Sequence, residues 1–166
     1  MTNGTDPIMK YILSHKYCNN TLLNNTYKLL LLKNHISSLQ ISNIIDSPYC
    51  TPNILRNDNL DGNNCLAIAA NKNNIQLIEK IMSSPNFTED IFLHTNHNGF
   101  VFIDYIKDIN MLNKILSLDN FSQDIVNVLD KDQCNIIMRL LFAREYDMVK
   151  SLIKSGKYDI SAIKQK

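Results

Sequence analysis

The chain has 166 residues, a formal net charge of +1 and a hydrophobic content of 45%. This composition supports a buried core and excludes wholesale disorder, and the length suits one compact domain or one short array of repeats. Acidic and basic residues are scattered without a basic run, which argues against nucleic-acid binding, because that function needs a clustered positive face.

The first predicted elements are a single helix and then a weak helix pair. Asp6 is a suitable N-cap and Pro7 is tolerated at the first helical position, so we expect a leading helix over residues 6–16. Aliphatic residues between positions 27 and 32 and between 39 and 45 then predict a pair of helices within residues 22–58.

The pattern is clearest in residues 59–82. A polar stretch containing Asp61-Gly62 leads into a helix of small residues that ends in Ala69-Ala70. The second helix, residues 75–82, carries aliphatic residues at the i, i+3, i+4 spacing of a one-sided stripe. Isolated helices below about 12–15 residues are marginal in water, so this unit needs neighbours of its own kind.

The chain supplies these neighbours as internal repeats. Asn59, Asn96 and Asp130 lie 37 and then 34 residues apart, a period that indicates stacked units. The same spacing relates a second set of positions, namely Gly62, Gly99 and Gln133. We therefore expect repeats at approximately 59–95, 96–129 and 130–163, after the weaker one at 22–58. The middle repeat fits if the turn between its helices is about three residues shorter.

The last repeat ends with a clear stop signal. Gly156 follows the final periodic residues, as glycine commonly does after a helix, and a short tail with Ile160 and Ile163 comes after it. No stretch of the sequence has the composition of a linker between domains. We expect a single domain over residues 6–163.

With the repeats aligned, the sequence resembles the ankyrin-repeat family. The family pattern is a hairpin tip with Asp and Gly, then Thr-Pro-Leu-His-x-Ala-Ala, then a helix similar to Leu-Glu-Ile-Val-x-x-Leu-Leu. Residues 61–70 follow the first part, with Asn64, Cys65 and Ala67 in place of Thr, Pro and His, and residues 75–82 and 146–153 match the second helix. The resemblance implies an all-α, ankyrin-type solenoid. No repeat retains Thr-Pro-Leu-His, so a generic helical solenoid stays open as an alternative.

The composition also resembles that of one group of ankyrin proteins. Heavy use of Asn, Ile and Lys together with degenerate repeats is similar to the expanded ankyrin families of large DNA viruses that infect amoebae, although AT-rich protists share this bias. If the chain is viral, we expect it in the host cytoplasm. No apolar run approaches bilayer length and no signal-peptide segment opens the chain, so we expect a soluble, intracellular protein without membrane contact.

The residues that could carry chemistry do not form a catalytic group. The four cysteines lack a CxxC pair and His94 with His97 lacks a third ligand nearby, so neither a zinc site nor another metal site is expected. The carboxylates Glu89-Asp90 and Asp130 with Asp132 are expected in the hairpins, where they satisfy turn amides. We expect no enzyme activity and no cofactor.

A stacked solenoid instead offers an extended surface for a partner protein. By resemblance to the family, the contacts are expected on the concave face, at the hairpin tips and the exposed side of each first helix. The expected partner-binding residues are Leu60, Asp61, Asn63, Asn71, Lys72, His97, Asn98, Phe100, Lys131, Asp132, Cys134 and Phe142. Phe100 and Phe142 are of most interest because aromatic residues are enriched at interface hot spots, with core filling as their alternative role. The alternative function is a structural protein that self-associates through its terminal repeats, and we expect a monomer or a weak homo-oligomer.

Overall fold

The computed structural model describes residues 7–32 and 36–156, and the regular structure within these ranges is helical throughout. The elements in chain order are α1 (Pro7–Ser14), α2 (Asn20–Leu32), α3 (Ser38–Ile45), α4 (Pro52–Leu55), α5 (Cys65–Asn71), α6 (Ile75–Met82), α7 (Glu89–Phe92), the 3-10 helix η1 (Phe102–Tyr105), α8 (Ile109–Leu116), the 3-10 helix η2 (Gln123–Asn127), α9 (Ile136–Phe142) and α10 (Tyr146–Lys154).

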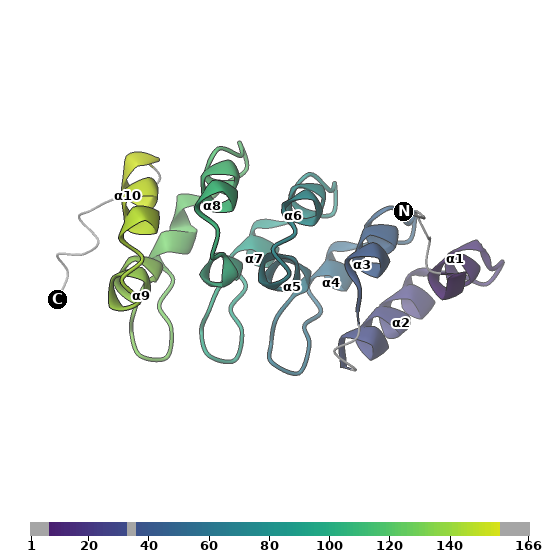
Figure 1. Ribbon diagram of the computed structural model, residues 1–166. Helices are drawn as coiled ribbons and strands as arrows, with labels where there is room; N and C mark the ends of the chain where they lie inside the picture. The colour runs from purple at the N-terminus through teal and green to yellow at the C-terminus, as the bar shows by residue number, and fades with distance from the viewer. Residues whose placement is uncertain (1–6, 33–35, 157–166) are drawn as a thin grey trace.

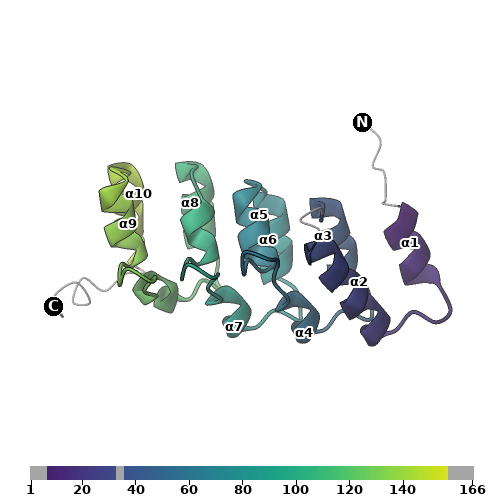
Figure 2. The same cartoon turned by 90° about the horizontal axis from the view of Figure 1, so that it is seen from below.

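The helices stand in a row that runs from α1 and α2 at one end to α9 and α10 at the other (Figure 1). Three long loops project from the same side of this row, and we name them finger 1 (residues 56–64), finger 2 (93–101) and finger 3 (128–135). Each finger connects one of the short helices α4, α7 and η2 to the element that follows it. Figure 2 shows α4 and α7 lined up along one edge of the row.

Two layers of helices build the row. One layer lies beside the fingers and contains α5, η1 and α9, and in it α5 packs against η1. The other layer contains α3, α6, α8 and α10, each packed against the next. The stripe that the sequence predicts on α6 is buried, with Leu77, Ile78, Ile81 and Met82 all facing the core. Burial of this stripe stabilises helices that are too short to persist alone.

Aromatic packing joins successive units of the row. Phe92 of α7 is buried, and the rings of Phe87, Phe102 and Phe121 surround it at centroid distances of 6.3, 5.1 and 5.4 Å. All three contacts are edge-on, the arrangement that aromatic quadrupoles favour. These residues come from both sides of finger 2, so the core runs along the row from one unit to the next.

The middle unit is shorter by the expected three residues, but at a different place from the one that the sequence indicates. The two N-caps of the helix pair are Asn64 and Asn74 in one unit, ten residues apart, but Val101 and Asp108 in the next, seven apart. This three-residue loss reduces the first helix of the pair to the 3-10 turn η1. The prediction that the turn is shorter is wrong: residues 72–74 separate the two helices in one unit and residues 106–108 in the next, so the turns have the same length and the loss falls in the first helix.

Several other positions that the sequence predicts differ slightly from those in the structure. The leading helix expected over 6–16 is α1, Pro7–Ser14, and the proposed cap Asp6 lies outside the described residues. Glu89 and Asp90, expected in a hairpin, lie instead in the first turn of α7, where acidic residues complement the helix dipole. Gly156 follows α10 with φ of +67°, as a helix stop requires. Ile160 and Ile163 lie outside the described residues.

Candidate binding surface

Each finger is organised by the side chain of its repeating Asn or Asp. Asn59 Oδ1 accepts hydrogen bonds from the backbone amides of Asp61 and Asn63, at 3.0 and 2.9 Å. Asn96 accepts in the same way in finger 2 and Asp130 in finger 3, with distances between 2.8 and 3.0 Å. A short side chain with an oxygen at this position satisfies two loop amides, which is why only Asn or Asp occurs there.

The tip of each finger needs a left-handed backbone. Gly62 and Gly99 have φ of +80° and +84°, and Gln133, at the equivalent position of finger 3, has φ of +59°. The two glycines also lie close to the next finger. A Cβ atom on Gly62 would lie 2.7 Å from the backbone nitrogen of His97, and one on Gly99 would lie 2.6 Å from Cα of Asp130. Glycine therefore permits both the turn and the contact between fingers.

The fingers are hydrogen-bonded to one another through the backbone. The His97 amide in finger 2 donates to the carbonyl of Asp61 in finger 1, at 3.1 Å. The Lys131 amide in finger 3 donates to the carbonyl of Asn98 in finger 2, at 3.2 Å. The same bond thus recurs from one finger to the next, and it fixes the spacing of their tips.

Tyr105 of η1 adds a side-chain link between fingers 1 and 2. Its hydroxyl donates to Asn63 Oδ1 and accepts from Asn96 Nδ2, both at 2.7 Å. Desolvation by burial raises the pKa of Tyr105, so the phenol stays neutral and keeps its proton for this bond. Tyr105 could be predicted from sequence as part of a helix, but not as a link between two loops.

An ionic cluster around Arg139 of α9 joins η1 to finger 3. The guanidinium binds both oxygens of Asp104, at 2.7 and 2.8 Å, and Asp130 Oδ2 at 3.2 Å, and it lies over the ring of Phe100, 5.3 Å from its centroid. It also donates to the carbonyl of Cys134. The three charged side chains are 14, 7 and 5% exposed, so solvent screens them little.

The two carboxylates of this cluster respond differently to their surroundings. Burial raises the pKa of Asp104 even though Arg139 opposes the shift. Burial also acts to raise the pKa of Asp130, but the amides of Cys134 and Asp132 and the Arg139 guanidinium together hold it below its ordinary value. Because Arg139 pairs with both groups inside the fold, we regard the cluster as a structural brace and not as a pair of catalytic carboxylates.

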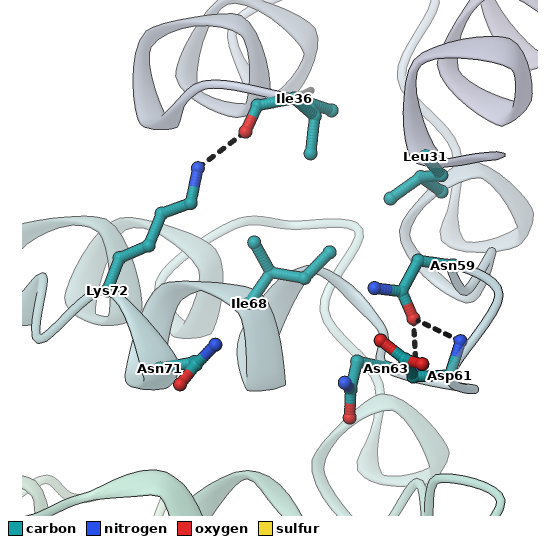
Figure 3. A pocket seen from close by; sticks show the side chains of 8 residues that line it. All are labelled: Leu31, Ile36, Asn59, Asp61, Asn63, Ile68, Asn71 and Lys72. Carbon is teal, nitrogen blue, oxygen red and sulfur yellow. Dashed lines mark hydrogen bonds between the residues drawn. The ribbon is translucent and has the colours of Figure 1, made fainter. Parts of the chain in front are cut away.

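A cavity of about 250 Å³ opens between finger 1, α5 and the end of α2 (Figure 3). Four of the predicted partner-binding residues lie around it, namely Asp61, Asn63, Asn71 and Lys72. The Lys72 ammonium reaches across the opening and donates to the carbonyl of Ile36, at 2.5 Å. The remaining lining mixes the amide of Asn59 with the side chains of Leu31, Ile36 and Ile68. The lining thus combines amides, one carboxylate and one cation with an apolar base.

Most of the other predicted partner-binding residues are exposed. Leu60 at the tip of finger 1 is 61% exposed, and Phe142 at the end of α9 is 78% exposed. His97 and Asn98 of finger 2 and Lys131 and Asp132 of finger 3 are also exposed. We call the tips of the three fingers, together with Asn71, Lys72 and Phe142, the finger surface.

Three predicted residues do not lie freely on this surface. Asn63 is buried, and its side-chain oxygen is engaged by Tyr105, so this oxygen holds the fingers together and is not available to a partner. Phe100 is half-buried beneath Arg139, which matches its alternative role as a filler of the fold. Cys134 is only partly exposed, and its carbonyl accepts from Arg139. Sequence position alone could not separate these inward residues from their exposed neighbours.

The remaining candidates for chemistry serve the fold. His94 Nε2 lies 2.8 Å from the carbonyl of Gly62, a link between fingers 1 and 2. Burial raises the pKa of Cys65 to about 12 and that of Cys50 to about 11, which disfavours the reactive thiolates. Within residues 7–32 and 36–156 no group of three or more His, Cys, Asp or Glu side chains could hold a metal ion.

Comparisons of the chain with protein-family models, with curated proteins and with solved structures found no match. Across the part of the chain that the structure describes, no helix combines the length and the apolar character needed to cross a bilayer.

Proposed function

We propose that the chain is an ankyrin-type solenoid that binds a partner protein on its finger surface, without enzyme activity. The observation that carries the proposal is the pair of matched backbone hydrogen bonds between fingers, from His97 to Asp61 and from Lys131 to Asn98. These bonds hold three tips at a fixed spacing before any partner arrives. A pre-organised surface loses little conformational entropy on binding, which favours affinity.

The side chains on the finger surface suit a protein partner. Exposed apolar groups stand at its two ends, Leu60 on finger 1 and Phe142 on α9, and aromatic residues of this kind commonly act as interface anchors. Between them lie charged and polar side chains of both signs, among them Asp61 and Lys131. Mixed charge with separate apolar anchors is typical of a protein interface and unlike the uniform positive face that nucleic acid requires.

The organism that supplies the partner depends on the organism that encodes the chain. The composition resembles that of ankyrin proteins from large DNA viruses of amoebae, and for a viral chain the partner would be a host protein in the cytoplasm. The alternative function is self-association through a terminal repeat, which involves a different surface from the fingers.

Capture experiments with the full chain as bait test the proposal. Leu60→Asp and Phe142→Asp each replace an exposed apolar anchor without touching the core. Leu39→Asp is the matched control, since Leu39 is also exposed, at 40%, but belongs to α3 in the layer away from the fingers. A partner that the two finger-surface variants lose and the control retains, with unchanged helix content in all three, supports the proposal. A partner captured equally by all three variants contradicts it.

A further inference from the structure

The cavity beside finger 1 is small and has an aliphatic base. Its volume of about 250 Å³ lies below the roughly 300–1,000 Å³ of pockets that hold a whole cofactor or a drug-sized ligand. Leu31, Ile36 and Ile68 form the base, and all three are buried. Figure 3 shows Lys72 on one side of Ile68 and Asp61 on the other. These properties suit a single aliphatic side chain that has a polar end.

The hydrogen bonds between fingers 1 and 2 fix the orientation of the Asn63 amide. Asn96 Oδ1 accepts from the backbone amides of Asn98 and Phe100, so Nδ2 is the atom that Asn96 turns to Tyr105. Because this nitrogen donates to the Tyr105 hydroxyl, the hydroxyl proton is left for Asn63 Oδ1, at 2.7 Å. Asn63 must therefore turn its oxygen to Tyr105 and its nitrogen elsewhere.

The Asn63 nitrogen is a donor that the fold leaves to the cavity. The side chain of Asn63 lines the cavity and is only 9% exposed, and its Nδ2 has no hydrogen-bond partner among the residues that the structure describes. A buried donor without a partner is unfavourable, so an acceptor that reaches this nitrogen is strongly favoured. The Lys72 ammonium is a second donor, since it gives one proton to the carbonyl of Ile36 and has two more.

Asp61 adds an acceptor and disfavours a charged guest. Its carboxylate lines the same cavity, is exposed, and forms no ion pair within the described part of the chain. An anion would be attracted by Lys72 but repelled by Asp61, and a cation would be attracted by Asp61 but repelled by Lys72. A primary carboxamide is neutral, and it supplies an acceptor for Asn63 and Lys72 together with a donor for Asp61.

We propose that the cavity receives the carboxamide of a glutamine side chain of the partner protein, with its oxygen at Asn63 Nδ2 and Lys72 Nζ and its nitrogen at Asp61. The two methylene groups of the glutamine pack over Ile68. The inference rests on the proposed function, because the finger surface brings the partner to the mouth of the cavity. Tyr105 is a positioning residue, since it sets which atom of Asn63 faces the guest.

NMR titration of the full chain with capped amino acids tests the inference without the partner. We expect N-acetylglutamine amide to shift the amide signals of Asp61, Asn63 and Lys72, with a dissociation constant of about 1 mM, as the efficiency of so small a ligand allows. At low ionic strength the matching glutamate and lysine probes should bind at least about tenfold more weakly. Glutamate meets the carboxylate of Asp61, and lysine leaves Asn63 Nδ2 unpaired.

Isosteric variants test the role of each polar group. Asn63→Asp keeps an acceptor for Tyr105 but replaces Nδ2 by an oxygen, and it should weaken binding of the glutamine probe at least about tenfold. Asp61→Asn removes the negative charge and should let the glutamate probe bind at least as well as the glutamine probe. Asp132→Asn is the matched control, since Asp132 occupies the same position in finger 3, outside the cavity lining, and should change neither affinity.

Tyr105→Phe tests the positioning role through selectivity. It frees the Asn63 amide to turn, so the preference for the glutamine probe over the lysine probe should fall, which a loss of stability alone would not cause. An unchanged preference would refute this role of Tyr105.

Several outcomes would overturn the inference. They are no shift with the glutamine probe, equal binding of all three probes through the capping amides that they share, and undiminished binding of the glutamine probe to Asn63→Asp. Tighter binding of free glutamine than of the capped probe would also overturn it, because it would indicate a site for a small molecule. If the titration fails while Leu60→Asp still loses a captured partner, the proposed function stands and the carboxamide site alone is refuted.

Discussion

Gly99→Ala is the substitution that most clearly separates contact between fingers from the geometry of one finger. Gly99 has φ of +84°, and a Cβ atom there would lie 2.6 Å from Cα of Asp130 and 3.0 Å from its carbonyl carbon. These are backbone atoms, so no side-chain rotation relieves the overlap. Gly156 has a similar φ of +67°, but a Cβ atom there would meet nothing within 4 Å among the residues that the structure describes. Gly156→Ala is therefore the matched control.

The two substitutions share one cost and differ in another. A left-handed backbone costs an L-residue about 1–2 kcal/mol, and both variants bear this cost. Only Gly99→Ala must also move finger 3 by about 1 Å to restore an ordinary carbon–carbon separation of about 3.5–4.0 Å. Overpacking of this size typically costs about 1–3 kcal/mol. We expect Gly99→Ala to lower the free energy of unfolding by about 2–5 kcal/mol and Gly156→Ala by about 1–2 kcal/mol.

Urea denaturation followed by circular dichroism measures both values, with the slope of the transition checking that the same surface unfolds. Gln133→Gly gives a third comparison, in which the free energy of unfolding is expected to rise. It relieves the strained backbone of finger 3, at φ of +59°, where the described part of the chain has no later finger, and should stabilise the chain by up to about 1 kcal/mol. Equal losses in Gly99→Ala and Gly156→Ala would refute the reasoning, because fingers 2 and 3 would then not be in contact.

Two further predictions concern buried ionisable groups. Arg139→Ala leaves the carboxylates of Asp104 and Asp130 buried without their cation. It should therefore lower the free energy of unfolding, measured with heat or urea, by about 3–5 kcal/mol. A loss below about 1 kcal/mol would show that the cluster is not a brace. At pH 8 a thiol reagent should modify Cys134 well before Cys65, as mass spectrometry of quenched samples would show, because burial raises the pKa of Cys65 to about 12. The pKa of an unfolded thiol is about 8.5, whereas Cys65 stays protonated in the fold up to a pH of about 12. The free energy of unfolding should therefore fall as the pH rises from about 8.5 to about 12. The slope for this thiol is at most about 1.4 kcal/mol per pH unit. Equal modification rates would contradict its burial.

The repeating framework could be predicted from the sequence because it depends on local geometry. An Asx side chain must accept two loop amides at the start of each finger, and a tip residue must adopt positive φ, so Asn59 and Gly62 have counterparts at fixed distances along the chain. The aliphatic stripe of α6 follows from helical periodicity in the same way. Such requirements act within a few residues and leave a pattern that a single sequence reveals.

The braces between units could not be predicted, because they depend on residues far apart in the chain. Asp104 and Arg139 are 35 residues apart and meet only after η1 and α9 are in place. Arg139 stands where the earlier unit has Ile68, so the periodic pattern favours an apolar residue there. Tyr105 likewise follows the helical pattern, while its hydroxyl links two fingers.

The sequence also could not predict which side chains of the finger surface point inward and which are exposed. Asn63 and Leu60 belong to the same finger and both suit an exposed loop, yet Asn63 turns inward to Tyr105 and Leu60 remains exposed. Phe100 and Phe142 have the same chemistry, but a guanidinium covers the first and solvent surrounds the second. Packing against the neighbouring unit decides both cases.

Amide hydrogen exchange at His97 and Lys131 tests most directly whether the fingers form one pre-organised surface. Both residues are exposed, and their amides are held by carbonyls of the preceding finger, at 3.1 and 3.2 Å. We predict that both amides exchange at least about a hundredfold more slowly than in a free peptide, consistent with an opening free energy of about 3 kcal/mol or more. Exchange of either amide at the free-peptide rate would show that the fingers move independently, and would contradict the proposed binding surface.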